Sequence, residues 1–163
     1  MIYAKLSDAP TYRGIHPRLD KALELLSISE HSTHDLKRKL QKKGYEKEEI
    51  EQVLQRLSEY GYLSDERYAR AYIRRALPSR SIRLICQELG QKGIRVTPES
   101  PLVSEVLEEE DYSEESQLLS VILRRVRGKD LSDEKERRRL YGYLQRRGFS
   151  YHSIQKTMIH LSL

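Results

Sequence analysis

The chain has 163 residues, of which 37% are hydrophobic and 34% are charged, so its apolar content suits a packed domain and is too low for a membrane protein. Thirty Lys and Arg residues against 25 Asp and Glu residues give a net charge of +5 with neutral histidines, a small difference between two large populations. The single cysteine, Cys86, excludes an intrachain disulfide, and neither a secretory signal nor a run of about 18 apolar residues occurs. We therefore expect a cytoplasmic protein that makes no membrane contact.

Apolar residues recur at spacings of three and four along almost the whole chain, beginning with Leu19, Ala22, Leu23 and Leu26. This spacing is typical of amphipathic helices, and no segment alternates with the period of two that a half-buried strand requires. The predicted fold class is therefore all-α. In chain order, the stripes and their start and stop signals predict helices over residues 17–29, 33–43, 46–60, 65–77, 80–92, 101–110, 112–127, 133–147 and 150–161.

One motif, Leu-x-x-[Lys/Arg]-Gly followed by an apolar residue, occurs three times. Its glycines are Gly44, Gly93 and Gly148, which lie 49 and 55 residues apart, each at the end of a helical stripe. Repetition at this period predicts three tandem three-helix repeats that form an elongated, curved array. The predicted repeats cover residues 17–63, 64–110 and 111–163, and they follow an N-terminal segment, 1–16, that we expect to be poorly ordered.

Charge is separated into blocks. Residues 67–95 hold eight basic residues and one acidic residue, residues 96–123 hold eight acidic residues and no basic ones, and residues 124–147 hold ten basic and four acidic residues. Like charges three and four positions apart on a helix repel each other, which favours a positive surface for a nucleic acid or for an acidic protein groove. In the alternative, the arginines of residues 124–147 face solvent and pair in part with the adjacent acidic block.

Signatures of catalysis are absent. The chain has no nucleophile elbow, no phosphate-binding glycine loop and no dinucleotide fingerprint. Cys86 falls in an apolar stripe and is interpreted as a buried, inert thiol, and His31 and His34 have no third ligand at a suitable spacing. We therefore predict a protein that is not an enzyme and that uses no cofactor and no metal.

Four tyrosines border the first basic block: Tyr60, Tyr62, Tyr68 and Tyr72. Aromatic rings beside cations can stack on nucleic-acid bases. Packing is the simpler interpretation, because Tyr72 lies in an apolar stripe and Tyr60 and Tyr62 flank Gly61 between two repeats.

Taken together, these motifs resemble the RecX family of RecA regulators. The residues that carry the resemblance lie in Ala22–Leu26, Glu30–Ser32, Asp35–Tyr45, Gly61–Ala69, Ile82–Ile94 and Leu144–Ser150. The resemblance extends over nearly the whole chain after about residue 16. The chain differs from the family at residues 76–81, where members usually have a Gly-Pro-containing turn, and at Tyr112, where they often have Trp.

The resemblance implies a regulator that lies in the helical groove of the RecA filament and inhibits filament extension, ATP hydrolysis and strand exchange. It also implies a role in DNA recombination, DNA repair and the SOS response. We expect a monomer. The alternative is a helical-repeat protein that antagonises recombination by occupying single- or double-stranded DNA directly. The predicted contact surface for RecA or DNA consists of Arg74, Arg75, Arg80, Arg83, Lys92, Arg124, Arg125, Arg127, Arg137, Arg138, Arg139, Arg146 and Arg147.

Overall fold

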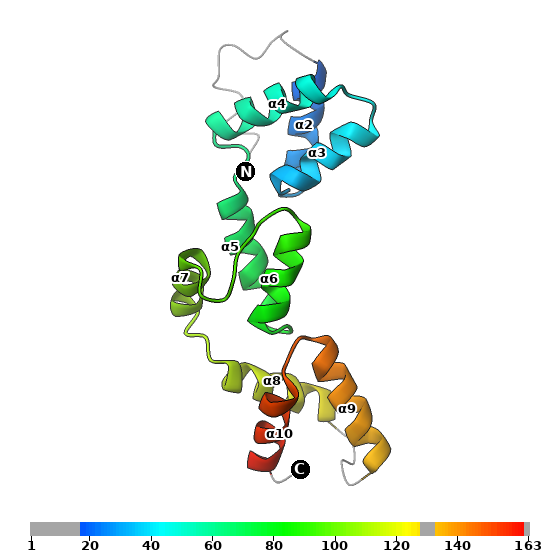
Figure 1. The fold of residues 1–163 in the computed structure, drawn as a ribbon, viewed down its shortest axis with the longest axis vertical. Coiled ribbons are helices and arrows are strands. Elements are labelled where there is room, and N and C mark those ends of the chain that lie inside the picture. Colours follow the sequence, from blue (N-terminus) through cyan, green and yellow to red (C-terminus); the bar gives the residue numbers. More distant parts are fainter. Residues whose placement is uncertain (1–16, 128–132, 162–163) are drawn as a thin grey trace. The chain divides into compact units, whose positions relative to one another are not determined.

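A computed structural model of the chain describes residues 17–127 and 133–161 (Figure 1). The predicted N-terminal segment, 1–16, lies outside the described residues. The helices are α2 (Pro17–Ile28), α3 (Thr33–Lys42), α4 (Lys47–Glu59), α5 (Asp65–Ala76), α6 (Ile82–Gln91), α7 (Pro101–Glu109), α8 (Glu114–Val126), α9 (Glu134–Arg146) and α10 (Tyr151–His160). No strand occurs in these two described ranges, so the all-α prediction is confirmed there.

Capping side chains set where the helices begin. Helix α6 starts two residues later than predicted because Ser81 is its cap, with the Ser81 hydroxyl accepting a hydrogen bond from the backbone N–H of Leu84 (3.3 Å). Helix α8 likewise starts two residues later than predicted, because the Ser113 hydroxyl accepts from the N–H of Ser116 (3.4 Å). The apolar stripes of α6 and α8 were predicted correctly, and the serine that precedes each stripe sets the residue at which the helix begins.

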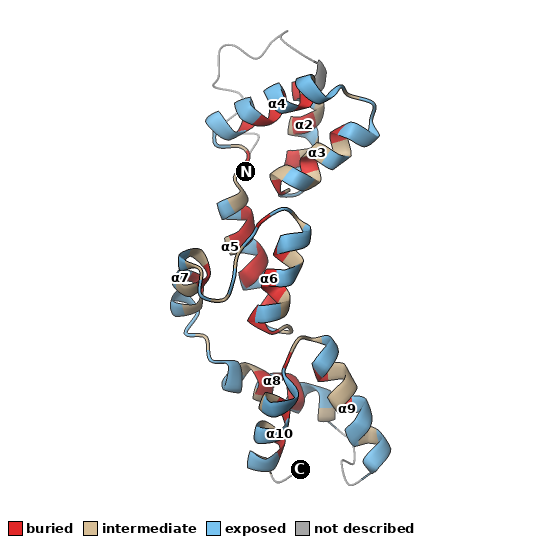
Figure 2. Ribbon diagram, viewed as in Figure 1, coloured by how far each residue is buried: buried red, intermediate tan, exposed pale blue. Residues whose placement is uncertain are grey.

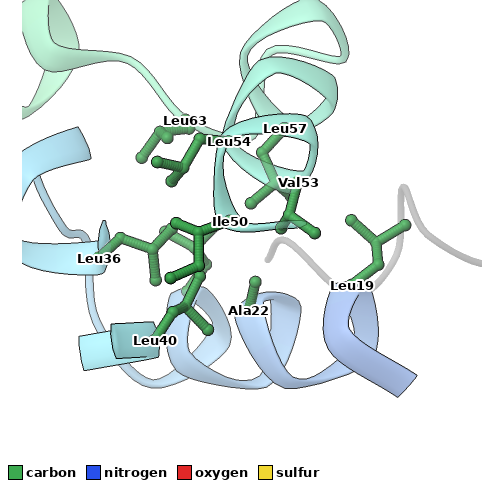
Figure 3. Packing of buried hydrophobic residues seen from close by; sticks show 10 residues of the cluster. Leu19, Ala22, Leu36, Leu40, Ile50, Val53, Leu54, Leu57 and Leu63 are labelled. Carbon is green, nitrogen blue, oxygen red and sulfur yellow. The ribbon is translucent and has the colours of Figure 1, made fainter. Parts of the chain in front are cut away.

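The described residues divide into two units. The first contains the chain up to Tyr68 together with Lys92–Ile94, and the second contains Ala69–Gln91 and the chain from Arg95 onward. In the first unit, helices α2, α3 and α4 pack their apolar stripes on one another around Leu36, Leu40 and Ile50, all at most 1% exposed (Figure 3). Fully burying one such side chain stabilises the fold by about 1.5–3 kcal/mol.

In the second unit, helices α8, α9 and α10 share a similar core. Leu118, Ile122, Leu144 and Ile154 are fully buried in it, and Phe149 closes it at the turn before α10. Helices α5, α6 and α7 also turn apolar faces inward, as the red stripes in Figure 2 show. Each of these short helices depends on its neighbours for stability, because helices of this length are marginal alone.

The three motif glycines each end a helix, as predicted, and all adopt the left-handed conformation, with φ of +84° at Gly44, +82° at Gly93 and +86° at Gly148. After Gly148, the N–H of Phe149 donates back to the carbonyl of Leu144 (3.2 Å), which completes a Schellman cap. Only glycine adopts this backbone conformation without a steric penalty.

Two of these glycine turns also pack on the start of an earlier helix. A Cβ at Gly93 would lie 2.7 Å from the Cβ of His34 in the first turn of α3, and a Cβ at Gly148 would lie 2.5 Å from the Cβ of Leu84 in the first turn of α6. At Gly44 a Cβ would meet nothing within 4 Å. The glycine turn at Gly93 therefore packs on α3 within the first unit, and the turn at Gly148 packs on α6 within the second.

Candidate partner-binding surface

Two arginines of α5, Arg70 and Arg74, are neutralised within their own unit. Arg74 of α5 pairs with Glu109 of α7 and, through Nε at 3.0 Å, with Glu110 directly after that helix. Arg70 of the same helix pairs with Glu105 (2.5 Å). In the part of the chain that the structure describes, no ion pair joins the acidic residues 96–123 to the basic residues 124–147. The alternative pairing considered from the sequence is therefore not found, because α7 packs its acidic face beside α5.

Two more predicted cations support local structure. Arg80 donates to Glu88 (2.8 Å), which also accepts a hydrogen bond from the hydroxyl of Tyr72 (2.8 Å). Lys92 binds Asp35 (3.1 Å), an ion pair beside the close contact between Gly93 and α3. These charges are committed to contacts within the protein.

Arg124 of α8 supports the turn between α5 and α6. Its guanidinium donates to the carbonyls of Pro78 and Ser120, and Gln117 of α8 donates to the carbonyl of Arg80 (2.7 Å). Side-chain donors from α8 thus satisfy carbonyls of the segment in which the sequence differs from the RecX pattern.

On α9, Arg138 and Arg139 pair with carboxylates on their own helix. Arg138 binds Glu134 (2.6 Å) one turn away, and Arg139 binds Glu136. Exposed pairs of this kind contribute only a few tenths of a kcal/mol, so a partner's carboxylate can displace them at little cost.

The remaining predicted cations make no ion pair with a carboxylate of the described residues. They are Arg75, Arg83, Arg125, Arg127, Arg137, Arg146 and Arg147. Arg147 is half-buried and the other six are exposed. Arg75 lies over the ring of Tyr72, at 5.3 Å from the ring centre. Five of the seven arginines lie in the segment that contains α8, α9 and α10, which we call the third three-helix segment. Most of these seven cations, which have no carboxylate partner among the described residues, therefore lie on α8, on α9 and directly after these two helices.

A cluster of three side chains organises part of this charge. The guanidinium of Arg125, at the end of α8, lies 4.9 Å from the ring centre of Tyr143 in α9, and that of Arg147 lies 5.1 Å from the same ring. We call Arg125, Tyr143 and Arg147 the Tyr143 cluster. Cation–π contacts orient both guanidiniums without neutralising them, which leaves two oriented donors for an acidic or phosphate group.

Sequence reasoning did not single out Tyr143. The signal was present in the segment Tyr141–Arg147, where two tyrosines precede two arginines. Tyr143 became recognisable only when the fold brought Arg125 beside it from another helix.

The surroundings of Cys86 and His31 indicate structural roles for both residues. Burial, and then the nearby Glu99, raises the pKa of the Cys86 thiol to about 11, so the thiol is protonated near neutral pH. His31 lies 3.0 Å from the Nζ of Lys39, and no group of three or more His, Cys, Asp or Glu side chains able to hold a metal occurs in the described residues.

The tyrosines beside the first basic block are mainly packing residues. Tyr68 and Tyr72 are buried, and Tyr62 packs on the core of the first unit. Tyr60 is exposed, with its ring centre 6.5 Å from that of Tyr62. The packing interpretation is confirmed for Tyr62, Tyr68 and Tyr72.

None of the described helices combines the length and the apolar character that crossing a bilayer requires.

Comparison with known proteins relates both halves of the chain to one family. Residues 19–57 match the model of the first three-helix domain of RecX, and residues 113–158 match that of its third three-helix domain. The chain is 35% identical over 146 residues to the regulatory protein RecX of Pelodictyon phaeoclathratiforme, covering 84% of each chain. It is also 35% identical over 141 residues to that of Syntrophotalea carbinolica, covering 82% of this chain and 91% of that protein.

A solved structure has a similar fold. The crystal structure of RecX from Lactobacillus salivarius matches with a TM-score of 0.65 at 18% identity, over 89% of this chain and 94% of that one. The prediction of an all-α fold made of three-helix repeats is confirmed by these matches together with the helices of the model.

Proposed function

Since the chain belongs to the RecX family of regulatory proteins, we propose that it binds the RecA nucleoprotein filament and inhibits filament extension, ATP hydrolysis and strand exchange. Family membership carries this proposal. We place the protein in the cytoplasm, where RecA acts, and assign it a role without catalysis.

The charge distribution supports a surface on the third three-helix segment. Arg125, Arg127, Arg146 and Arg147 are accessible cations that no described carboxylate neutralises. Accessible, uncompensated charge steers association with an acidic partner, whereas a cation already paired within the fold adds little. We therefore assign the main contact to the Tyr143 cluster together with Arg127 and Arg146. Arg74, Arg80 and Lys92 are assigned a smaller contribution.

The direct test is the ATPase activity of RecA on single-stranded DNA with and without the protein. We expect inhibition that saturates with protein concentration. The double variant Arg125→Ala with Arg147→Ala should require about tenfold more protein for the same inhibition, because two oriented charge-assisted contacts are lost. ATP hydrolysis that is unchanged at a saturating excess of the wild-type protein would refute the proposed function.

Direct occupation of DNA is the second candidate, and the Tyr143 cluster also suits it, because guanidiniums bind phosphates and bases stack on aromatic rings. Titration of bare single-stranded DNA at several salt concentrations separates the two candidates. DNA occupation would be favoured by tight binding in which the logarithm of the association constant falls by about 0.7 per phosphate contact for each unit of log salt concentration. Binding that appears only when RecA coats the DNA would favour the filament.

A further inference from the structure

A groove runs between α9 and α10, and the Tyr143 cluster does not line it. Its volume is about 560 Å³. From α9 it is lined by Arg137, Arg138, Tyr141 and Gly142, whose spacings of three and four residues place them on one helix face, and from α10 it is lined by Tyr151 and Met158. Figure 1 shows the two helices that form its walls.

Gly142 is the unusual residue of this groove, because it lies inside α9 rather than at its end. A glycine inside a helix destabilises it by about 0.5–1 kcal/mol relative to alanine. A Cβ at this position would meet only the Nη1 atom of Arg146 at 3.3 Å, the far end of a flexible side chain. Packing within the chain therefore does not require glycine here, and its effect is to open the floor of the groove to close approach by another backbone.

The lining combines aromatic surface with one uncompensated cation. The rings of Tyr141 and Tyr151 lie 5.6 Å apart, and Tyr151 is 58% exposed. Arg138 is paired with Glu134 at one end of the groove, whereas Arg137 makes no ion pair with any carboxylate of the described residues. The groove thus offers two tyrosine rings set among polar side chains, a gap at Gly142 and one exposed guanidinium, that of Arg137.

This combination suits a protein helix better than a nucleic acid strand. A phosphate backbone would pass the carboxylate of Glu134, and of the described lining residues only Arg137 is a cation without a carboxylate partner. An amphipathic helix would place apolar side chains on the two tyrosines and one carboxylate on Arg137. We propose that the groove between α9 and α10 binds an amphipathic helix of the protein partner, with its backbone closest to Gly142 and an acidic side chain at Arg137.

The proposal rests on the proposed function, since the partner is then the RecA filament. It is tested by filling the groove with Gly142→Leu and measuring the inhibition of RecA ATPase on single-stranded DNA. Leucine is a better helix former than glycine, so Gly142→Leu should fold at least as stably as the wild type. It should nevertheless need about tenfold more protein for half-maximal inhibition, as expected for a hot-spot contact.

Gly90→Leu is the matched control, because Gly90 is an exposed glycine within α6 at which a Cβ meets nothing within 4 Å. It should gain helix stability without any change in inhibition. Arg137→Glu should weaken inhibition, whereas Arg56→Glu, the same charge change on the exposed surface of α4, should not.

The outcomes separate the two proposals. If the wild type inhibits RecA and Gly142→Leu inhibits it equally well, the proposal for the groove is overturned and the proposed function stands. A wild type that neither binds nor inhibits RecA overturns the proposed function and, with it, the assigned partner of the groove. Loss of affinity for bare single-stranded DNA in Gly142→Leu, equal to the loss of RecA inhibition, would show that the groove holds nucleic acid and would also overturn the proposal of a protein helix.

Discussion

His31 shows how the surroundings of one side chain set its chemistry. It lies half-buried in the first unit, and Lys39 approaches its imidazole to 3.0 Å. Burial, and then the positive charge of Lys39, lowers the pKa of His31 below its ordinary value of 6.5. Asp35 opposes these effects without reversing them. In the folded protein the imidazole therefore stays neutral at a pH where the unfolded chain already binds a proton.

This difference predicts a pH dependence of stability. Above about pH 6.5 both states carry a neutral His31 and the residue costs nothing. As the pH falls through 6.5 toward the lower pKa of the folded state, the unfolded chain takes up the proton first, so the free energy of unfolding decreases. His31→Gln should remove part of this decrease, measured by urea unfolding at about pH 7.5 and about pH 5.5.

His152→Gln, on the exposed surface of α10, serves as the control for losing one histidine. A decrease of the same size in His31→Gln and in the wild type would contradict the assignment to His31.

At the scale of the element, one sequence motif serves two purposes. Gly44, Gly93 and Gly148 all end a helix in the left-handed conformation. Only the turns at Gly93 and Gly148 also press on the first turn of an earlier helix, where Ser32 caps α3 and Ser81 caps α6. The N–H of Ser81 donates to the carbonyl of Arg147 (2.8 Å), so the joint at α6 includes a backbone hydrogen bond.

The two kinds of turn should respond differently to the same substitution. Gly44→Ala should cost about 1–2 kcal/mol, because alanine is strained at positive φ but meets no neighbour. Gly148→Ala carries the same strain and adds overlap with Ser81 and Leu84, which raises the total to about 3 kcal/mol or more. Chemical denaturation of both variants checks the order, and equal losses would show that the turn at Gly148 does not need its close contact.

At the scale of the whole molecule, the distribution of charge matters more than its total. The net charge of +5 includes cations such as Arg74, which α7 neutralises, and cations such as Arg127, which no described carboxylate neutralises. Only accessible, uncompensated charge should give the molecule a strong, salt-sensitive attraction to an acidic partner.

Binding to RecA-coated single-stranded DNA should therefore weaken as salt rises from about 50 to about 200 mM. Removing both arginines of the Tyr143 cluster should flatten this dependence, because fewer charges then contribute to association. Arg56→Ala, which removes one exposed cation of α4, should leave the slope unchanged. Affinity measured by fluorescence anisotropy across the salt series checks this, and parallel slopes for the wild type and the Tyr143-cluster variant would contradict it.

The helical elements were readable from the sequence, because the spacing of apolar residues specifies which face of each helix is buried. The stripe in α4, for example, gives Ile50, Val53, Leu54 and Leu57, all of which are buried. The glycine turns were readable for a similar local reason, since positive φ is a property of a single residue and its neighbours. The boundaries of the three repeats stay a prediction.

Which cations stay uncompensated was decided only by tertiary structure. In the sequence, Arg74 and Arg125 belong to equivalent basic blocks, yet α7 brings Glu110 to the first and α9 brings Tyr143 to the second. The acidic partner of Arg74 lies 36 residues away, and local periodicity carries no information about contacts at that separation. The amino-acid sequence by itself thus determined the helices and their turns, because those follow from local backbone and burial preferences, whereas the packing of one helix on another selected the charges left available for a partner.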